Sequence, residues 1–270
     1  MRRANSDLLS IAPLTMLFLA INIVLYIYCA IQSGDFSDIH SNILISMGGS
    51  LREFFWEGDW TRIIMPNFLH GGLLHILFNS MSLWQVGPGA EMYFGSANFG
   101  TIYILSGVSG FCFSQIFGGN LSIGASCSLF GILGAILAIK VLAAPILKNA
   151  WKNSDVRQQV YFLLAYLLIG FSGMLGNVDN WGHLGGLIVG ILVGLMFELW
   201  RKNHPHRFLC ISAVLLVVTG IVCAARWSIF NPTYHVYMAV VAKEEGRDAE
   251  SQKEFEKAIE WSKFWNKDDR

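Results

Sequence analysis

The feature that most constrains this chain is a series of apolar runs, each about as long as a membrane-spanning helix. An α-helix rises about 1.5 Å per residue, so about 20 apolar residues cross the roughly 30 Å hydrocarbon core of a bilayer. Repeated segments of this length predict an all-α polytopic membrane protein. The seven runs are residues 11–31, 68–87, 99–118, 123–144, 160–175, 181–199 and 208–225.

Composition agrees with a lipid bilayer as the surroundings. Of the residues, 54% are hydrophobic and 14% are charged, whereas soluble domains carry about 25% charged residues. The net charge is zero and no Lys/Arg cluster is interleaved with aromatic residues, so we expect no nucleic-acid partner. The odd number of cysteines, without CxxC spacing, argues against a disulfide framework and a zinc site. We therefore expect no metal and no cofactor.

The chain divides into three parts. We expect residues 1–10 to be a cytoplasmic N-terminus, residues 11–229 a membrane domain with seven transmembrane helices, and residues 230–270 an amphipathic helical tail. The long connection 32–67 is partly apolar and rich in aromatic residues, which is typical of a segment in the membrane interface.

The tail predicts a helical hairpin with arms at 238–246 and 254–260, faintly similar to one tetratricopeptide unit. A single such unit cannot bury its own apolar face. The tail is therefore either a solvated hairpin with charge pairs or a docking module for a partner.

Basic residues predict the orientation. Seven spans place the two termini on opposite sides, and short cytoplasmic segments carry an excess of Lys and Arg. With the N-terminus inside, the three loops on the opposite side hold only Arg52 and Arg62, both in the first loop. We therefore expect a multi-pass protein of the cell membrane, with its N-terminus cytoplasmic and its C-terminus extracytoplasmic. The basic residues of the cytoplasmic segments are then Arg2, Arg3, Lys140, Lys148, Lys152, Arg157, Arg201, Lys202 and Arg207.

Polar side chains inside the apolar runs are the candidates for function, because a polar group is expensive there. His75 and Asn79 are four residues apart in the second run and share one helix face. Ser126 lies near the start of the fourth run and His183 near the start of the sixth. These even-numbered spans run parallel, so their starts lie on the same side of the membrane. Topology alone therefore brings the four side chains to the same side of the membrane.

The depth of Asn79 and Ser126 in the membrane limits whether the two side chains can meet. Asn79 lies about 16 Å along its span, whereas Ser126 is only three residues into its own. The two meet only if residues 118–122 dip into the membrane as irregular backbone, which is tolerated where it is buried in protein or lines a wet cavity.

Small residues predict that the helices carrying Ser126 and His183 pack tightly. Glycines recur on the His183 face, and small residues recur on the Ser126 face; such spacing lets helix backbones approach closely in a membrane. These residues are Gly186, Gly190 and Gly194 after His183, and Gly134 and Ala138 after Ser126.

The chemistry of this set is that of acyl transfer. A serine hydroxyl becomes a nucleophile when a histidine takes its proton, and the resulting oxyanion needs preorganised donors. His75, Asn79 and the free N–H groups at the start of the Ser126 helix can donate. No acid lies within the spans beside His183, and Asp179 is assigned to a loop, so we expect a Ser–His dyad.

Neighbouring residues offer alternatives to Ser126 and His75. Cys127 and Ser128 are rival nucleophiles, but each is rotated by about 100° or more from the face of Phe130. His70 is off the face of His75 and is expected to be structural.

Three motifs resemble those of the rhomboid family of intramembrane serine proteases, over about half of the chain. His70 to Asn79 is similar to the family's His-x4-His-x3-Asn helix, and Gly124-Ala-Ser126-Cys is similar to its Gly-x-Ser-Gly element. Gly182-His183 with Gly186 and Gly190 is similar to its Ala-His-x-x-Gly-x-x-x-Gly helix.

The resemblance implies a six-helix core with one additional C-terminal transmembrane helix. It implies Ser126 as nucleophile, His183 as general base, and His75 with Asn79 at the oxyanion. It also implies supporting roles for four residues: Gly124 in the serine motif, Phe130 against the catalytic histidine, Arg62 in the loop element Trp60-Thr61-Arg62, and Glu91 as a structural acid. Cys127, Thr61 and Phe130 stand where many relatives have glycine, tryptophan and tyrosine.

The expected function is therefore an intramembrane serine endopeptidase acting on transmembrane segments of membrane-anchored proteins. The main alternative is a catalytically inactive rhomboid-like protein that binds transmembrane clients. A transporter or proton-coupled channel would show paired intramembrane carboxylates or inverted repeats, and the sequence contains neither.

Overall fold

The structure is a computed structural model that describes residues 11–143, 147–171, 178–226 and 231–265. Within these ranges the regular structure is helical, apart from the isolated bridges Asp38–Gly72 and Ser50–Ser122. The predicted segment 1–10 and the end of the predicted run 160–175 lie outside the described residues. The protein is an all-α polytopic membrane protein, as the apolar runs predict.

Each predicted run corresponds to one long helix. The seven helices are α2 (Pro13–Ser33), α5 (Leu73–Phe94), α6 (Ser96–Phe117), α7 (Ser126–Leu142), α9 (Ser154–Phe171), α10 (Asn180–Arg201) and α11 (Arg207–Arg226). Among the described residues, α2, α6 and α10 are each long and apolar enough on their own to cross a membrane, and α7 and residues Cys210–Ala225 are shorter apolar helices. α5 is less apolar because it carries polar site residues.

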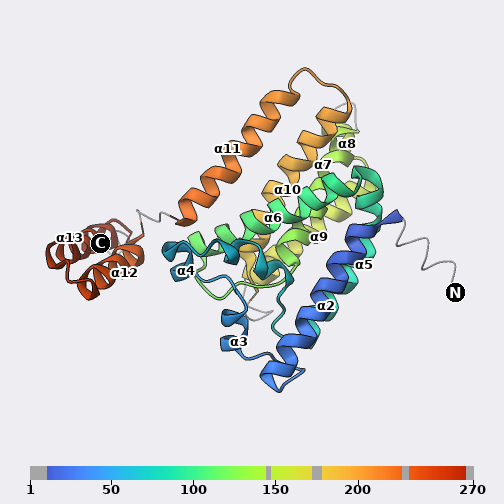
Figure 1. The fold of residues 1–270 in the computed structure, drawn as a ribbon. Helices are drawn as coiled ribbons and strands as arrows, with labels where there is room; N and C mark the ends of the chain where they lie inside the picture. Colours follow the sequence, from blue (N-terminus) through green and yellow to red (C-terminus); the bar gives the residue numbers. More distant parts are fainter. Residues whose placement is uncertain (1–10, 144–146, 172–177, 227–230, 266–270) are drawn as a thin grey trace.

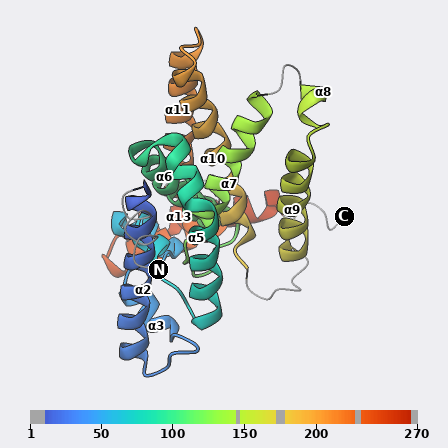
Figure 2. The same cartoon turned by 90° about the vertical axis from the view of Figure 1, so that its right-hand side faces the viewer.

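The bundle is centred on three helices. α10 makes its most extensive contacts with α7 and α6. α2 and α5 lie together at one edge of the bundle, and α9 lies at the opposite edge (Figure 2). α11 turns back from the end of α10 and leans toward the C-terminal hairpin (Figure 1).

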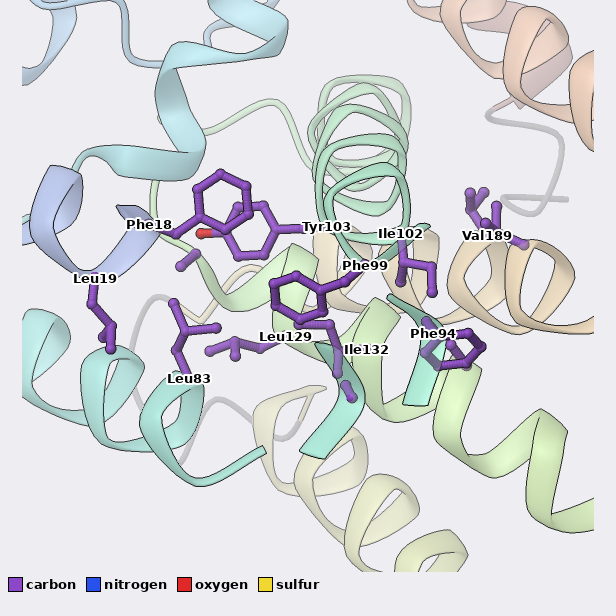
Figure 3. Packing of buried hydrophobic residues seen from close by; sticks show 14 of the residues in the cluster. Phe18, Leu19, Leu83, Phe94, Phe99, Ile102, Tyr103, Leu129, Ile132 and Val189 are labelled. Carbon is purple, nitrogen blue, oxygen red and sulfur yellow. The ribbon is translucent and has the colours of Figure 1, made fainter. Parts of the chain in front are cut away.

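An aromatic cluster joins α2 to α6. The rings of Phe18 and Tyr103 stack with their centroids 4.3 Å apart, and Phe99 lies 6.2 Å from Phe18. Figure 3 shows these rings facing Leu83 of α5 and Leu129 of α7. This core therefore packs against the middle of α5 and against the first turn of α7, which begins at Ser126.

The connection between α2 and α5 is folded into short helices. These are α3 (Ser41–Ser46), α4 (Arg52–Glu57), η1 (Trp60–Ile63) and η2 (Met65–Phe68). A further short helix, α8 (Leu147–Ala150), precedes α9.

The tail forms the predicted hairpin, with α12 (Pro232–Glu244) packed against α13 (Asp248–Trp265). The hairpin also contacts the α2–α5 connection: the Trp56 ring lies 5.3 Å from Tyr234 and 5.2 Å from Tyr237, whose hydroxyl donates to Glu57 (2.9 Å). The tail is therefore held against α4 (Figure 1).

Candidate functional site

Ser126 and His183 lie side by side at the starts of two helices. Ser126 is the first residue of α7, and His183 is in the first turn of α10. Ser126 Oγ lies 2.8 Å from His183 Nε2, within hydrogen-bonding distance, and the His183 side chain is buried. A hydroxyl and an imidazole in this arrangement form the pair that nucleophilic catalysis requires.

Close packing of α7 against α10 brings the pair together. A Cβ at Gly134 of α7 would lie 2.7 Å from the Leu187 carbonyl oxygen, and a Cβ at Gly194 of α10 would lie 2.6 Å from Ala135 Cα. A Cβ at Gly190 would overlap the backbone of Gly131. The predicted small-residue contact between these helices is confirmed, and it leaves no room for larger side chains.

Two aromatic rings hold the His183 imidazole. The Phe130 ring stacks on it at 4.5 Å with an angle of 9° between the planes, which is the contact that the resemblance implies for Phe130. The Tyr166 ring of α9 meets it edge-on at 5.5 Å and lies 5.1 Å from Phe130. Tyr166 was not predicted, because it lies in a run of apolar and aromatic residues without a polar motif.

His75 and Asn79 face the residues just before Ser126. A Cβ at Gly124 would lie 2.5 Å from His75 Nε2 and 3.6 Å from Asn79 Nδ2, so only glycine fits. Gly124 also has a φ of +112°, which favours glycine. The Gly71 N–H donates to His75 Nδ1 (3.4 Å), which leaves the proton on Nε2, facing Gly124. Asn79 Nδ2 donates to the His75 carbonyl oxygen (3.0 Å).

The backbone adds donors at the same place. The first helical hydrogen bond of α7 runs from the Leu129 N–H to the Ala125 carbonyl oxygen (2.9 Å). The N–H groups at the start of α7, including those of Ser126 and Cys127, therefore precede the hydrogen-bonded ladder of the helix. His75 and Asn79 lie beside Gly124, two residues before Ser126, so side-chain and backbone donors are both found at the start of α7.

The rival nucleophiles point elsewhere. The Ser128 hydroxyl is fully buried between Asn67 Oδ1 and the Tyr103 carbonyl oxygen, 2.6 Å from each. The Cys127 side chain is buried against Gly110 and Gly182, where added Cβ atoms would lie 2.9 Å from its sulfur. The His70 ring packs on His75 with centroids 5.0 Å apart.

Arg62 organises the connection beside the site. Its Nε donates to Asp59 (2.8 Å), and its Nη1 donates to the carbonyl oxygens of Ile45 (2.8 Å) and Gly49 (2.9 Å). Its guanidinium lies over the Phe54 ring at 3.6 Å. Arg62 therefore holds the α3–η1 segment together.

Glu91 lies at the opposite end of the bundle and caps α2. Its carboxylate accepts from the Leu14 N–H (3.0 Å), the Thr15 N–H (2.8 Å), and the hydroxyls of Thr15 and Ser96 (2.7 Å each). The first N–H groups of a helix have no partner within it, and Ala12 supplies no side-chain cap. Glu91 therefore satisfies the start of α2 from another helix.

Several known proteins have sequences similar to this chain. The chain is 30% identical over 207 residues to "Rhomboid protease GluP" of Bacillus subtilis, which covers 77% of this chain and 39% of that protein. It is 31% identical over 207 residues to "RHOMBOID-like protein 4" of Arabidopsis thaliana, with coverage of 70% and 51%. It is 28% identical over 220 residues to "Rhomboid protease AarA" of Providencia stuartii, with coverage of 74% and 78%.

The chain thus spans about two fifths to one half of the length of the first two of these relatives. The model of the family described as "Rhomboid domain" matches residues 57–200, which is more than half of the chain and includes Ser126, His183, His75 and Asn79. The protein belongs to the rhomboid family.

Proposed function

We propose that this protein is an intramembrane serine endopeptidase that cleaves transmembrane segments of membrane-anchored proteins. The observation that carries the proposal is the 2.8 Å separation of Ser126 Oγ and His183 Nε2 within a helical bundle. The relatives named rhomboid proteases support the same activity.

The proposed reaction uses each group in turn. Ser126 Oγ attacks the scissile carbonyl carbon while His183 Nε2 takes the hydroxyl proton. The oxyanion is stabilised by His75 Nε2, Asn79 Nδ2 and the N–H groups at the start of α7. The imidazolium then gives its proton to the departing amine, leaving an acyl-enzyme. Water, deprotonated by His183, hydrolyses this ester and restores the Ser126 hydroxyl.

Supporting roles follow from the contacts. Gly124 leaves space for His75, Phe130 and Tyr166 orient the imidazole, and Arg62 and Glu91 hold neighbouring segments. We further propose that residues 11–229 form the membrane domain and that the protein lies in the cell membrane with its N-terminus cytoplasmic and its C-terminus extracytoplasmic. The tail hairpin is a candidate docking module, since its α13 leaves Phe255 and Ile259 exposed.

The direct test is cleavage of a fluorescent transmembrane peptide by the purified protein in liposomes. Wild type should cleave it. Ser126→Ala and His183→Ala should each lower kcat by about 10³-fold or more, and the exposed Ser154→Ala should match wild type. If wild type is folded but cleaves none of several such peptides, the protease function is wrong, and the protein is to be studied as a client-binding rhomboid-like protein.

A further inference from the structure

Asp179 lies just before α10 and joins three segments through one carboxylate. Its Oδ1 accepts from the Gly182 N–H (2.9 Å) in the first turn of α10. Its Oδ2 accepts from the Ser122 hydroxyl, in the connection that leads to Ser126. The Ser114 hydroxyl, near the end of α6, also acts on this carboxyl by lowering its pKa. One side chain therefore links the helix of His183 to the chain that carries Ser126.

The connection from residue 118 to residue 125 is fixed on its other side by backbone hydrogen bonds. Ser122 and Ser50 exchange two of them (3.1 and 2.9 Å), and the Gly124 N–H donates to the Pro66 carbonyl oxygen (2.8 Å). These contacts tie the connection to the α2–α5 segment. The Asp179–Ser122 hydrogen bond ties it to α10 instead, which is the element that carries the proposed base.

Helix capping alone does not explain an acid at this position. Asn and Ser cap helices about as well as Asp. Burial raises the pKa of the Asp179 carboxyl, although hydrogen bonds from Ser122, Gly182 and Ser114 oppose that shift. A charged carboxylate is therefore costly here. An ionised carboxylate can accept several hydrogen bonds at once, because it has about four lone-pair sites and no donor of its own.

We propose that Asp179 is a positioning residue that sets the separation of Ser126 and His183 by clamping the 118–125 connection to the start of α10. The proposal rests on the proposed protease function. It does not make Asp179 a third member of a triad, because its carboxylate oxygens are directed at Ser122 and Gly182. A misplacement of about 1 Å in a catalytic pair costs about 10²-fold in rate, so a clamp between the two segments acts on kcat.

Cleavage kinetics of variants distinguish the Asp179–Ser122 contact from the cap that Asp179 forms on the Gly182 N–H. Ser122→Ala removes the hydrogen bond to the connection and leaves the Gly182 cap in place. It should lower kcat about tenfold with KM unchanged, and Asp179→Ala should lower kcat about 10²-fold. Asp179→Asn, which keeps an acceptor oxygen, should recover part of the loss. The double variant should be no slower than Asp179→Ala, since both substitutions break one contact. Asp155→Ala, an exposed acid in the first turn of α9, is the matched control.

A readout independent of catalysis distinguishes failure of the clamp from failure of the protease function. Hydrogen exchange of the amides in 118–125 should be faster in Ser122→Ala and Asp179→Ala than in wild type. The clamp is wrong if exchange there is unchanged, or if Ser122→Ala has wild-type kcat while Asp179→Ala only lowers the melting temperature. If wild type itself is inactive, the protease function fails, and the exchange experiment still decides whether the clamp exists.

Discussion

Phe130 and Tyr166 contact the His183 ring from two directions, one stacked and one edge-on. Among the described residues, His183 Nδ1 has no hydrogen-bond partner. The orientation of the imidazole therefore depends on ring packing. In a Ser–His–Asp triad, a carboxylate hydrogen-bonded to Nδ1 orients the ring instead.

Replacing Phe130 by leucine should reduce activity without unfolding the protein. An aromatic pair contributes about 0.5–1.5 kcal/mol beyond burial, so we expect kcat to fall about twofold to tenfold with KM unchanged. Phe130→Tyr keeps the ring and should stay within about twofold of wild type. Cleavage kinetics in liposomes check this, and equal kcat values for Phe130→Leu and wild type would show that the stack does not orient His183.

The polar residues of the site are predictable from the sequence, but not all of the residues that contact them are. Ser126, His183, His75 and Asn79 were recognisable because polar groups are rare in apolar runs, and the structure brings them together. Tyr166 was missed because an aromatic residue in a membrane helix carries no such signal. The sequence predicts that Asp179 lies in a loop, and it lies just before α10, but its side-chain contacts depend on tertiary structure that periodicity does not report.

The α7–α10 contact is the element on which the site depends. A Cβ at Gly190 would overlap the Gly131 backbone, so a larger residue there cannot be accommodated by moving a side chain alone. Helix separation and the distance between Ser126 and His183 are therefore coupled.

Gly190→Ala should destabilise the protein by about 1–3 kcal/mol through overpacking and lower its activity. Gly220→Ala in α11 is the control, since a Cβ there meets nothing within 4 Å and alanine is the better helix former. Thermal unfolding in detergent measures both. A Gly190→Ala melting temperature equal to or above that of Gly220→Ala would contradict this account of the packing.

The tail hairpin should depend on pH through Glu254. Burial disfavours its carboxylate, but hydrogen bonds from Lys257 and His235 outweigh this and lower the Glu254 pKa from its ordinary value of 4.5. A lowered pKa stabilises the fold above the unfolded-state pKa, and this stability is lost as the pH falls through the folded-state pKa. Hydrogen exchange of α12–α13, corrected for its intrinsic pH dependence, should show opening below about pH 4.5. Glu254→Gln should weaken the hairpin at neutral pH and remove this dependence; an identical pH profile in both would contradict it.

The ends of a helix are predictable from the sequence where a change in hydropathy sets them. They are not predictable where tertiary contacts set them. The second apolar run ends at Gly87, but α5 continues through Pro88 to Phe94. Its last turns are held by the bonds of Glu91 to the start of α2. Likewise, hydropathy predicts that the α2–α5 connection lies in the membrane interface. It does not reveal that Arg62 holds this connection by donating hydrogen bonds to two of its carbonyl oxygens.

For the whole molecule, we propose from the seven helices and the bias of basic residues that the two ends lie on opposite sides of the membrane. A phosphatase that is active only outside the cytoplasm, fused after residue 270, should be active in a bacterial host. The same reporter inserted after Lys152 should be silent. The reverse pattern at both sites would show that the orientation is inverted.

We propose that Ser126 is a nucleophile activated by His183. The most direct measurement is labelling of the folded protein with a fluorophosphonate probe, followed by mass-spectrometric mapping of the modified residue. We expect one adduct at Ser126, strong loss of labelling in His183→Ala, and no adduct at Ser128. A folded wild-type protein that remains unlabelled, or is labelled at another residue, would contradict the claim.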